Sequence, residues 1–132
     1  MVQYMVEPGI KGHKTIMVTE ENTARAVGSG TLPVFATPMM IALIEATASE
    51  SMTAVLEEGK STVGTKLDVA HSAATPVGMQ VDCDTELIEV DRRRLVFKVT
   101  VYDAVGEVGS GIHERFIVDE AKFMEKATAK LA

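Results

Sequence analysis

One carboxylate interrupts the most apolar stretch of the chain. Glu45 lies within Pro38–Ala48, where Thr47 is the only other polar residue. A helix of this composition is apolar on most sides, so we expect protein to surround it. Burial disfavours the charged form of a carboxyl group and raises its pKa unless a partner compensates, which is how proteins prepare a general base or acid. Glu45 is therefore either a catalytic group or a structural carboxylate that pairs with an Arg or faces solvent.

Three further residues have types that suit chemistry beside such a carboxylate. His71 precedes the small-residue loop Ser72–Pro76, which predicts a ring at a sheet edge beside a cleft, where it can transfer a proton or donate a hydrogen bond. Gly64 interrupts a strand-like segment, which indicates a β-bulge or the close approach of a ligand. Thr37 precedes Pro38 and fits the N-cap of a helix. Each of the three has an ordinary structural explanation, so none decides a function alone.

Other chemistries lack a motif in the sequence. No two histidines have metal-ligand spacing, and neither a GxSxG elbow nor a glycine-rich phosphate loop with a Lys is present. His13 and His113 belong to no recognisable constellation. Arg92–Arg94 is predicted to form a solvated hairpin tip, although it could also meet the phosphates of a long anionic ligand. We therefore expect no metal site and no serine-hydrolase or nucleoside-triphosphate chemistry.

The helix that carries Glu45 must be positioned by the elements around it. We expect this helix to have Thr37 as its N-cap, to run to about Glu57 or Glu58, and to stop at Gly59. Before it, the sequence predicts a short strand at 15–19 and then a mobile surface loop at 20–33. The chain would thus enter its central helix from a flexible segment.

Alternating apolar and polar residues dominate the second half of the chain and predict four antiparallel strands joined by compact turns. Gly109 and Gly111 interrupt the last of these strands, and we expect them to pack against the central helix. The closing segment, 119–131, is predicted to be an amphipathic helix that packs on the domain. The four strands are expected at residues 61–71, 79–90, 95–102 and 107–118.

Composition limits the class of protein. The 132 residues, 46% of them hydrophobic, suit one domain spanning 1–132 with its own core. Cys83 is the only cysteine, and its place in an alternating strand predicts a small buried hydrophobe in a reducing, cytoplasmic setting. The net charge of −6 argues against nucleic-acid binding, and neither an export signal nor a membrane-spanning run is present.

A strand, a long apolar helix and four further strands predict an α+β fold. Because the helix needs burial on most sides, the antiparallel sheet is expected to curve around it. This layout places the predicted strand edges, including His71, near the helix that holds Glu45.

Three separated motifs resemble one known family. They are VFATPMMIALIE at 34–45, VGTKLDVAHSAATPVG at 63–78 and GSGIHERF at 109–116. In this order they resemble the fluoroacetyl-CoA thioesterases, a branch of the hotdog-fold acyl-CoA thioesterases, over about 34–123. The resemblance implies a hotdog fold, a homodimer or larger assembly, and hydrolysis of an acyl-CoA without metal or cofactor.

The resemblance also implies roles for individual residues. Arg115 lies in the matching HER segment and is expected to have a structural or interface role. The phenylalanines that the family's fluoroacetyl-specific members carry in a lid are absent from 20–33, where Gly30 and Thr31 stand, so we expect a different short or aromatic acyl group. The catalytic residues would be Thr37, Glu45 and His71, and the substrate-binding residues Gly64, Val34 and Phe35.

The spacing of these residues constrains the mechanism. Thr37 and Glu45 are eight positions apart, so one straight helix separates them by roughly 12 Å along its axis. Either the substrate spans this gap, or one site takes Thr37 and Glu45 from different subunits. Glu45 would activate water or attack the thioester itself, while a backbone N–H near Gly64 and His71 stabilise the oxyanion and His71 protonates the thiolate.

Two other functions are compatible with the same residues. A hotdog hydratase or dehydratase would also use an acid and a His on an acyl thioester. A non-catalytic acyl-CoA binding module would need neither group, and it gains nothing from a buried carboxylate, which favours the enzymes.

Overall fold

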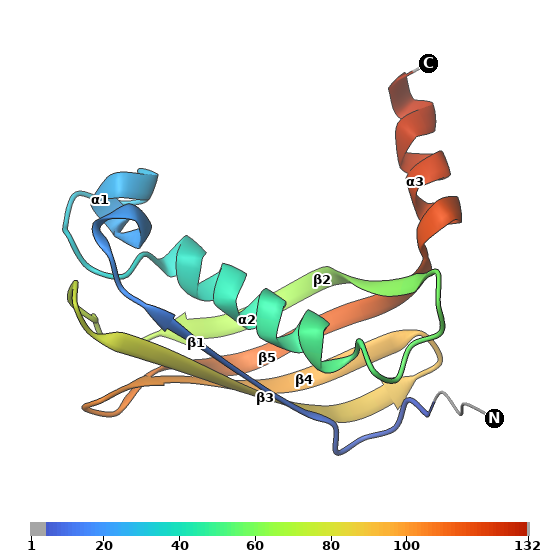
Figure 1. Ribbon diagram of the computed structural model, residues 1–132, viewed down its shortest axis with the longest axis horizontal. Helices are drawn as coiled ribbons and strands as arrows, with labels where there is room; N and C mark the ends of the chain where they lie inside the picture. Colours follow the sequence, from blue (N-terminus) through green and yellow to red (C-terminus); the bar gives the residue numbers. More distant parts are fainter. Residues whose placement is uncertain (1–4, 132) are drawn as a thin grey trace.

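A curved antiparallel sheet lies beneath a central helix in the computed structural model, which describes residues 5–131 (Figure 1). The ends of the expected domain 1–132 therefore lie outside the described residues. Within the described part, five strands form one sheet in the order β1-β3-β4-β5-β2, all antiparallel. This architecture confirms the expected α+β class. The strands are β1 (Lys11–Met17), β2 (Lys60–His71), β3 (Gln80–Asp91), β4 (Arg94–Asp103) and β5 (Glu107–Asp119).

Strand boundaries follow the expected ones closely except in β1. The sequence predicts this strand at 15–19, whereas it begins at Lys11 and ends at Met17. The difference arises because its outward residues pair with polar partners on β3: His13 Nδ1 lies 2.6 Å from Asp84 Oδ1, and Thr15 donates to Asp82 at 2.6 Å. Such polar pairing leaves no hydrophobic alternation to detect.

The core lies between the inner face of the sheet and helix α2 (Thr37–Ser51). Met40 and Ile44 of α2 are fully buried, as are Phe97 and Val99 of β4. Cys83 is also fully buried, and burial raises the pKa of its thiol to about 11, which confirms the interpretation of Cys83 as a small hydrophobe. No helix among residues 5–131 has the length and hydrophobicity needed to cross a membrane.

Helix α2 departs from expectation at both ends. Its N-cap is Ala36, so Thr37 is the first helical residue rather than the cap. It ends at Ser51, not near Glu57 or Glu58. Met52 is fully buried and Val55 and Leu56 pack against the core, so the chain folds back toward the sheet instead of continuing the helix.

Protein does not surround α2, which corrects the expectation drawn from its apolar composition. The helix packs mainly over β1 and β3, and the side nearer β2 stays open. Pro38 and Ala42 are exposed there, and Ile41 and Glu45 are half-buried. A single chain therefore leaves an apolar strip of its central helix uncovered.

The segment before α2 is structured rather than a mobile loop. It contains η1 (Glu20–Asn22) and α1 (Ala24–Val27). The Asn22 side chain accepts from Thr19 N at 2.9 Å and donates to Met17 O at 3.0 Å, and the buried Thr23 caps α1 by accepting from Ala26 N at 3.2 Å. These local side-chain bonds replace the hydrophobic contacts that a sequence pattern detects.

The C-terminal helix α3 (Glu120–Thr128), followed by η2 (Ala129–Leu131), stands away from the sheet (Figure 1). All its residues are exposed, including Phe123 and Met124. The expectation that it packs on the domain is therefore wrong. Asp119 caps the helix by accepting from Lys122 N at 3.2 Å, so local capping rather than packing defines its start.

Candidate active site

Glu45 lies on the open side of α2 and is held by Arg115 of β5. Arg115 Nη1 lies 3.3 Å from Glu45 Oε2, and the Glu45 side chain is 41% exposed. The expectation of a carboxylate inside the core is therefore wrong for one chain: the group faces an opening beside β2. The pair leaves Glu45 oriented by a buried guanidinium yet accessible to a ligand.

Arg115 itself is held by a second set of bonds. Its side chain is buried, Nε donates to Thr62 Oγ1 at 2.8 Å, and Nη2 donates to Thr62 O at 2.9 Å. Burial lowers the pKa of Arg115 and the neighbouring Glu45 raises it, although a guanidinium remains charged. Arg115 therefore presents a fixed positive charge to Glu45, as a structural role predicts.

His113 extends this network, although its sequence context gives no sign of a constellation. It is fully buried, its Nδ1 lies 2.8 Å from Lys66 O, and its Nε2 lies 3.2 Å from Arg115 Nη1. A carbonyl at Nδ1 and an N–H at Nε2 suit a neutral ring that donates to the first and accepts from the second. Burial lowers the pKa of His113, which agrees with the neutral form.

Gly64 lies directly against the Glu45 carboxylate. Gly64 pairs with Arg115 and Lys66 pairs with Glu114, so Thr65 is the additional residue of a β-bulge. A Cβ at position 64 would collide with Glu45 Oε2. The bulge expected as one alternative at Gly64 is therefore confirmed, and the group that lies closest to Gly64 is the Glu45 carboxylate rather than another backbone.

The other interior strand glycines have packing roles. A Cβ at Gly109 would lie 2.7 Å from Met40 Sδ, so Gly109 packs against α2 as expected. Gly111 instead lies against the β2 backbone at Asp68 and Val69, which corrects the expectation that it too faces the helix.

Thr37 and His71 form a second cluster at the start of α2. Thr37 Oγ1 lies 2.8 Å from His71 Nδ1, so the hydroxyl serves this bond instead of capping the helix. His71 Nε2 is buried without a partner among the described residues. Burial lowers the pKa of His71, against a weaker opposing effect of the Ala73 backbone. The ring thus offers one unused nitrogen at the end of edge strand β2, as its position in the sequence predicts.

A hollow of about 300 Å³ opens beside this second cluster. Thr37, His71, Val34 and Phe35 contribute to its wall, and the Phe35 ring meets the His71 ring edge-on at 6.5 Å between centroids. Glu45 does not line it. One chain therefore brings Thr37 and His71 together with Val34 and Phe35. It holds Glu45 and Gly64 in a separate place.

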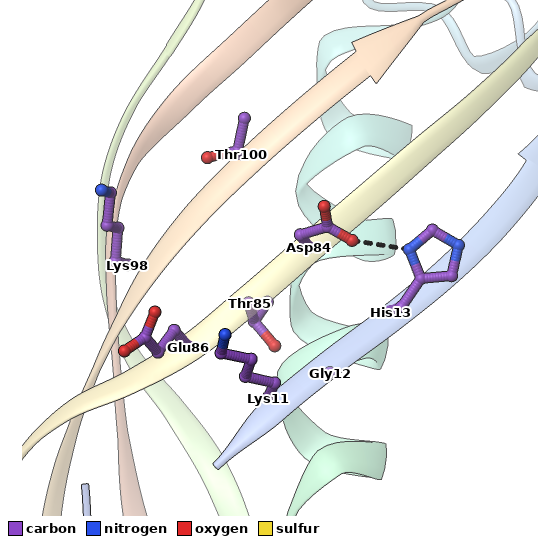
Figure 2. A pocket seen from close by; sticks show the side chains of 8 residues that line it. All are labelled: Lys11, Gly12, His13, Asp84, Thr85, Glu86, Lys98 and Thr100. Atoms are coloured by element: carbon purple, nitrogen blue, oxygen red, sulfur yellow. Dashed lines mark hydrogen bonds and ion pairs between the residues drawn. The ribbon is translucent and has the colours of Figure 1, made fainter. Parts of the chain in front are cut away.

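A wider hollow, of about 530 Å³, lies on the sheet face opposite α2 and contains none of the expected site residues (Figure 2). Side chains of β1, β3 and β4 project into it, and His13 binds Asp84 at its rim. Lys11, Glu86 and Lys98 also line this hollow (Figure 2). The contact between His13 and Asp84 joins neighbouring strands, which is ordinary for the solvent face of a sheet.

The family model described as fluoroacetyl-CoA-specific thioesterase (FlK) matches residues 18–121, which include both clusters. The chain belongs to this family. It is therefore a thioester hydrolase, and its sheet and helix form the hotdog fold of such enzymes. Over 97 residues it is 42% identical to the fluoroacetyl-CoA thioesterase of Streptantibioticus cattleyicolor, covering 74% of this chain and 70% of that protein.

Solved structures agree with the family and with the fold. A variant of FlK in complex with fluoroacetate and CoA superposes with a TM-score of 0.84 at 35% identity, covering 89% of this chain and 99% of that one. A hot-dog-like protein from Thermanaerovibrio acidaminovorans, 20% identical, matches with a TM-score of 0.86 over 95% of this chain and 93% of its own. The second match concerns the fold alone.

Proposed function

We propose that the chain hydrolyses a small acyl-CoA to the free acid and CoA, with Glu45 as the central catalytic group. The observation that carries this proposal is the Glu45 carboxylate, half-exposed on α2 and fixed by the buried Arg115 against Gly64. Membership of a thioesterase family and the likeness to an enzyme that binds CoA support the substrate class. The residue roles rest on this geometry and on the family resemblance.

We further propose that the active site is composite and forms in a homodimer. Glu45 and the Thr37–His71 pair lie at different places in one chain, and Glu45 does not line the hollow beside His71. The uncovered strip of α2, with Pro38 and Ala42, lies beside the free edge strand β2. A second copy that covers this side would bring Glu45 of one chain to His71 of the other.

The chemistry follows from what each group can offer. Glu45 takes a proton from water while the water oxygen adds to the thioester carbonyl, and the resulting oxyanion accepts hydrogen bonds from His71 Nε2–H and a backbone N–H near Gly64. The C–S bond then breaks. Because a thiol has a pKa of about 8.5, the thiolate leaves readily and can recover the proton from Glu45. In the alternative route, Glu45 attacks the carbonyl and water hydrolyses the mixed anhydride.

His71 suits the donor role better than the acid role. Thr37 Oγ1 can donate to Nδ1, which leaves the proton of a neutral ring on Nε2. A lowered pKa keeps the ring neutral near pH 7, and a neutral imidazole donates a hydrogen bond without transferring its proton. We therefore propose that His71 binds the oxyanion and that Thr37 orients His71.

The acyl group is proposed to differ from fluoroacetyl. The lid segment 20–33 contains no aromatic residue, and Ala24 and Ser29 line the hollow beside His71. Small side chains at this wall leave room for another short or an aromatic acyl group.

A thiol-release assay over a panel of acyl-CoAs tests the function. We expect Glu45→Gln to lower kcat by about 10² to 10⁴ and His71→Ala to lower it by about 10². Water addition to an enoyl-CoA without thiol release would identify a hydratase, and tight acyl-CoA binding without turnover would identify a binding module. Rapid-quench trapping of a mixed anhydride on Glu45 identifies the nucleophile route. Single-turnover hydrolysis in oxygen-18 water also detects it where water attacks the Glu45 carboxyl carbon, because a Glu45 oxygen then appears in the acid.

Mixing two inactive variants tests the composite site separately. Glu45→Gln and His71→Ala subunits, unfolded and refolded together at equal amounts, should regain about a quarter of wild-type activity, since half of the random dimers would hold one intact site of two. Activity that stays at the level of the separate variants would show that each chain carries a complete site.

A further inference from the structure

Three consecutive arginines lie where β3 turns into β4, at one end of the sheet. Arg92 and Arg93 form the turn and Arg94 begins β4, and residues 92–94 are called the tip below. Arg92 has a φ of 59°, a left-handed conformation that Gly or Asn ordinarily adopts at a hairpin turn. An L-residue such as Arg is strained in this conformation, because its Cβ lies too close to the backbone carbonyl. Nothing in the packing of the fold compensates, because its side chain is 94% exposed. A strained, solvent-facing cation on a chain with a net charge of −6 indicates a role outside the fold.

Ion pairs at this tip leave Arg92 and Arg93 able to bind an anionic ligand. Arg94 is occupied, since it binds Glu89 at 2.6 Å and Glu114 at 2.9 Å. Arg92 lies 3.8 Å from Asp91 in an exposed pair, which solvent screens strongly. Arg93 is exposed and has no side-chain ion pair or hydrogen bond within residues 5–131. Arg94 thus anchors the hairpin, while Arg92, in its weak exposed pair, and Arg93 present guanidinium groups to solvent.

An aromatic ring lies beside these arginines. Phe116 of β5 pairs in register with Arg94 and is 41% exposed, and it lines a hollow of about 410 Å³ with Asp91 and the three arginines. Guanidinium groups match phosphate oxygens in a planar, two-pronged geometry, and an exposed ring can stack on a purine. The combination suits a phosphorylated adenosine better than a small inorganic anion, which would leave the ring unused.

The tip is close to the candidate active site along the strands. Phe116 follows Arg115, the partner of Glu45, and pairs with Val63, which precedes Gly64. Phe116 faces the side of the sheet opposite α2, as does Arg94, which binds Glu114 there. A ligand with a thioester at Glu45 and a nucleotide at the tip must therefore pass around the sheet end, which the long pantetheine arm of coenzyme A allows.

We propose that Arg92, Arg93 and Phe116 bind the phosphorylated adenosine end of the acyl-CoA. Arg92 and Arg93 contact its phosphates and Phe116 stacks on the purine. This inference rests on the proposed function for the identity of the ligand, and it adds a recognition site that takes no part in the chemical step. The tip should therefore affect KM for CoA thioesters and leave kcat unchanged.

Two substrates with the same acyl group test the proposal, one a CoA thioester and the other a pantetheine thioester without the nucleotide. We expect Arg92→Ala combined with Arg93→Ala to raise KM for the CoA thioester about tenfold, and Phe116→Ala to raise it several-fold. KM for the pantetheine thioester should not change. Equal KM changes for both substrates, or no change for either, would overturn the proposal.

Two further variants separate recognition from folding and from overall charge. Arg92→Gly should unfold at the same or a higher temperature, because Gly relieves the strain at φ 59°, yet it should weaken CoA binding. Lys11→Ala combined with Lys98→Ala removes two positive charges from the outer face of the sheet and should change KM less than twofold. A loss of affinity equal to that of the tip variants in this control would contradict a specific site.

Calorimetry with 3′,5′-ADP and CoA measures nucleotide binding at the tip independently of catalysis. Wild type should bind both about tenfold more tightly than the Arg92/Arg93 double variant. Equal affinities would reject the tip site even if the enzyme hydrolyses acyl-CoA. If wild type hydrolyses no thioester, the proposed function fails, whereas the difference in nucleotide affinity still decides the role of the tip.

Discussion

Arg115 makes Glu45 depend on residues from two strands. Its guanidinium contacts Glu45 with the same Nη1 atom that meets His113, while Thr62 holds the rest of the group. A change in any of these contacts shifts the charge that faces Glu45. At the scale of single residues, the position of the Glu45 carboxylate therefore depends on Arg115, Thr62 and His113.

Gly64 provides a direct test of this positioning. Gly64→Ala places a Cβ where Glu45 Oε2 now lies, so the carboxylate must move. We expect kcat to fall about 10²-fold and the free energy of unfolding to fall by about 1–3 kcal/mol. Kinetics and chemical denaturation measure both effects.

Gly106→Ala is the matched control for Gly64→Ala. A Cβ at Gly106 meets nothing within 4 Å, and its φ is not in the left-handed region. This variant should keep wild-type kcat. Unchanged activity in Gly64→Ala would show that the closeness of Gly64 and Glu45 has no catalytic importance.

His113 predicts a pH dependence of stability. Burial lowers its pKa in the folded chain, whereas an unfolded His titrates near its ordinary value of about 6.5. The neutral ring thus stabilises the fold fully above about pH 6.5, and this contribution is lost as the pH falls below that value. His71 acts in the same direction.

His113→Gln removes one of these two groups, so its unfolding free energy should fall less than that of wild type between pH 7 and pH 5. Urea denaturation at both pH values measures the difference, and equal losses would contradict a neutral buried His113.

Two parts of the site differ in how far they could be predicted from sequence. Glu45, Gly64 and His71 are unusual for their local context, so the sequence marks them as candidates, although each also has an ordinary structural explanation. Arg115 is 70 positions from Glu45, and their contact depends on the pairing of β2 with β5 and on the bulge at Gly64. No pattern along one strand reveals such a contact.

At the scale of elements, the short helix α1 forms part of the wall of the hollow beside His71. Ala24 and Ser29 line this hollow, and Thr23 caps α1 while donating to Glu20 O at 2.9 Å. Hydrophobic periodicity cannot predict this helix, because its start is defined by side-chain bonds of Asn22 and Thr23. Its four residues depend on that cap for their conformation.

Thr23→Ala should make segment 20–33, which contains α1, more mobile without unfolding the domain. Loss of the cap destabilises the helix by about 1 kcal/mol, so we expect KM for the acyl-CoA to rise a few-fold. Limited proteolysis should cut faster within 20–33. Thr53→Ala, an exposed position after α2, is the control and should match wild type in both measurements. Identical proteolysis of the two variants would contradict the capping role.

At the scale of the whole molecule, the pairing of β3 with β4 and of β4 with β5 follows from alternation and compact turns, whereas the edge positions of β1 and β2 and the cover of α2 do not. Its apolar residues correctly predict a helix on the inner face of the sheet. Pro38 and Ala42 are apolar yet exposed in one chain, so composition alone predicted a burial that a single copy does not supply. The same limit explains α3, whose amphipathic pattern predicts packing that is absent within the described residues.

Ala42→Arg tests whether a second copy covers this strip. A charged side chain on a dimer interface would remain unpaired and desolvated, so we expect monomers in light-scattering chromatography and loss of thioester hydrolysis. Ala104→Arg, in the exposed β4–β5 turn, should leave assembly and activity unchanged. An active Ala42→Arg monomer would contradict the composite site.

The buried Cys83 makes the protein convenient to assay by thiol chemistry. Its thiol is inaccessible and its pKa is raised to about 11, so a chromogenic disulfide reagent should react with the released CoA and not with the folded enzyme. Since Cys83 is the only cysteine, the same reagent reports unfolding: one thiol per chain becomes reactive when the core opens. Turnover and loss of structure can thus be followed with one reagent in the same sample.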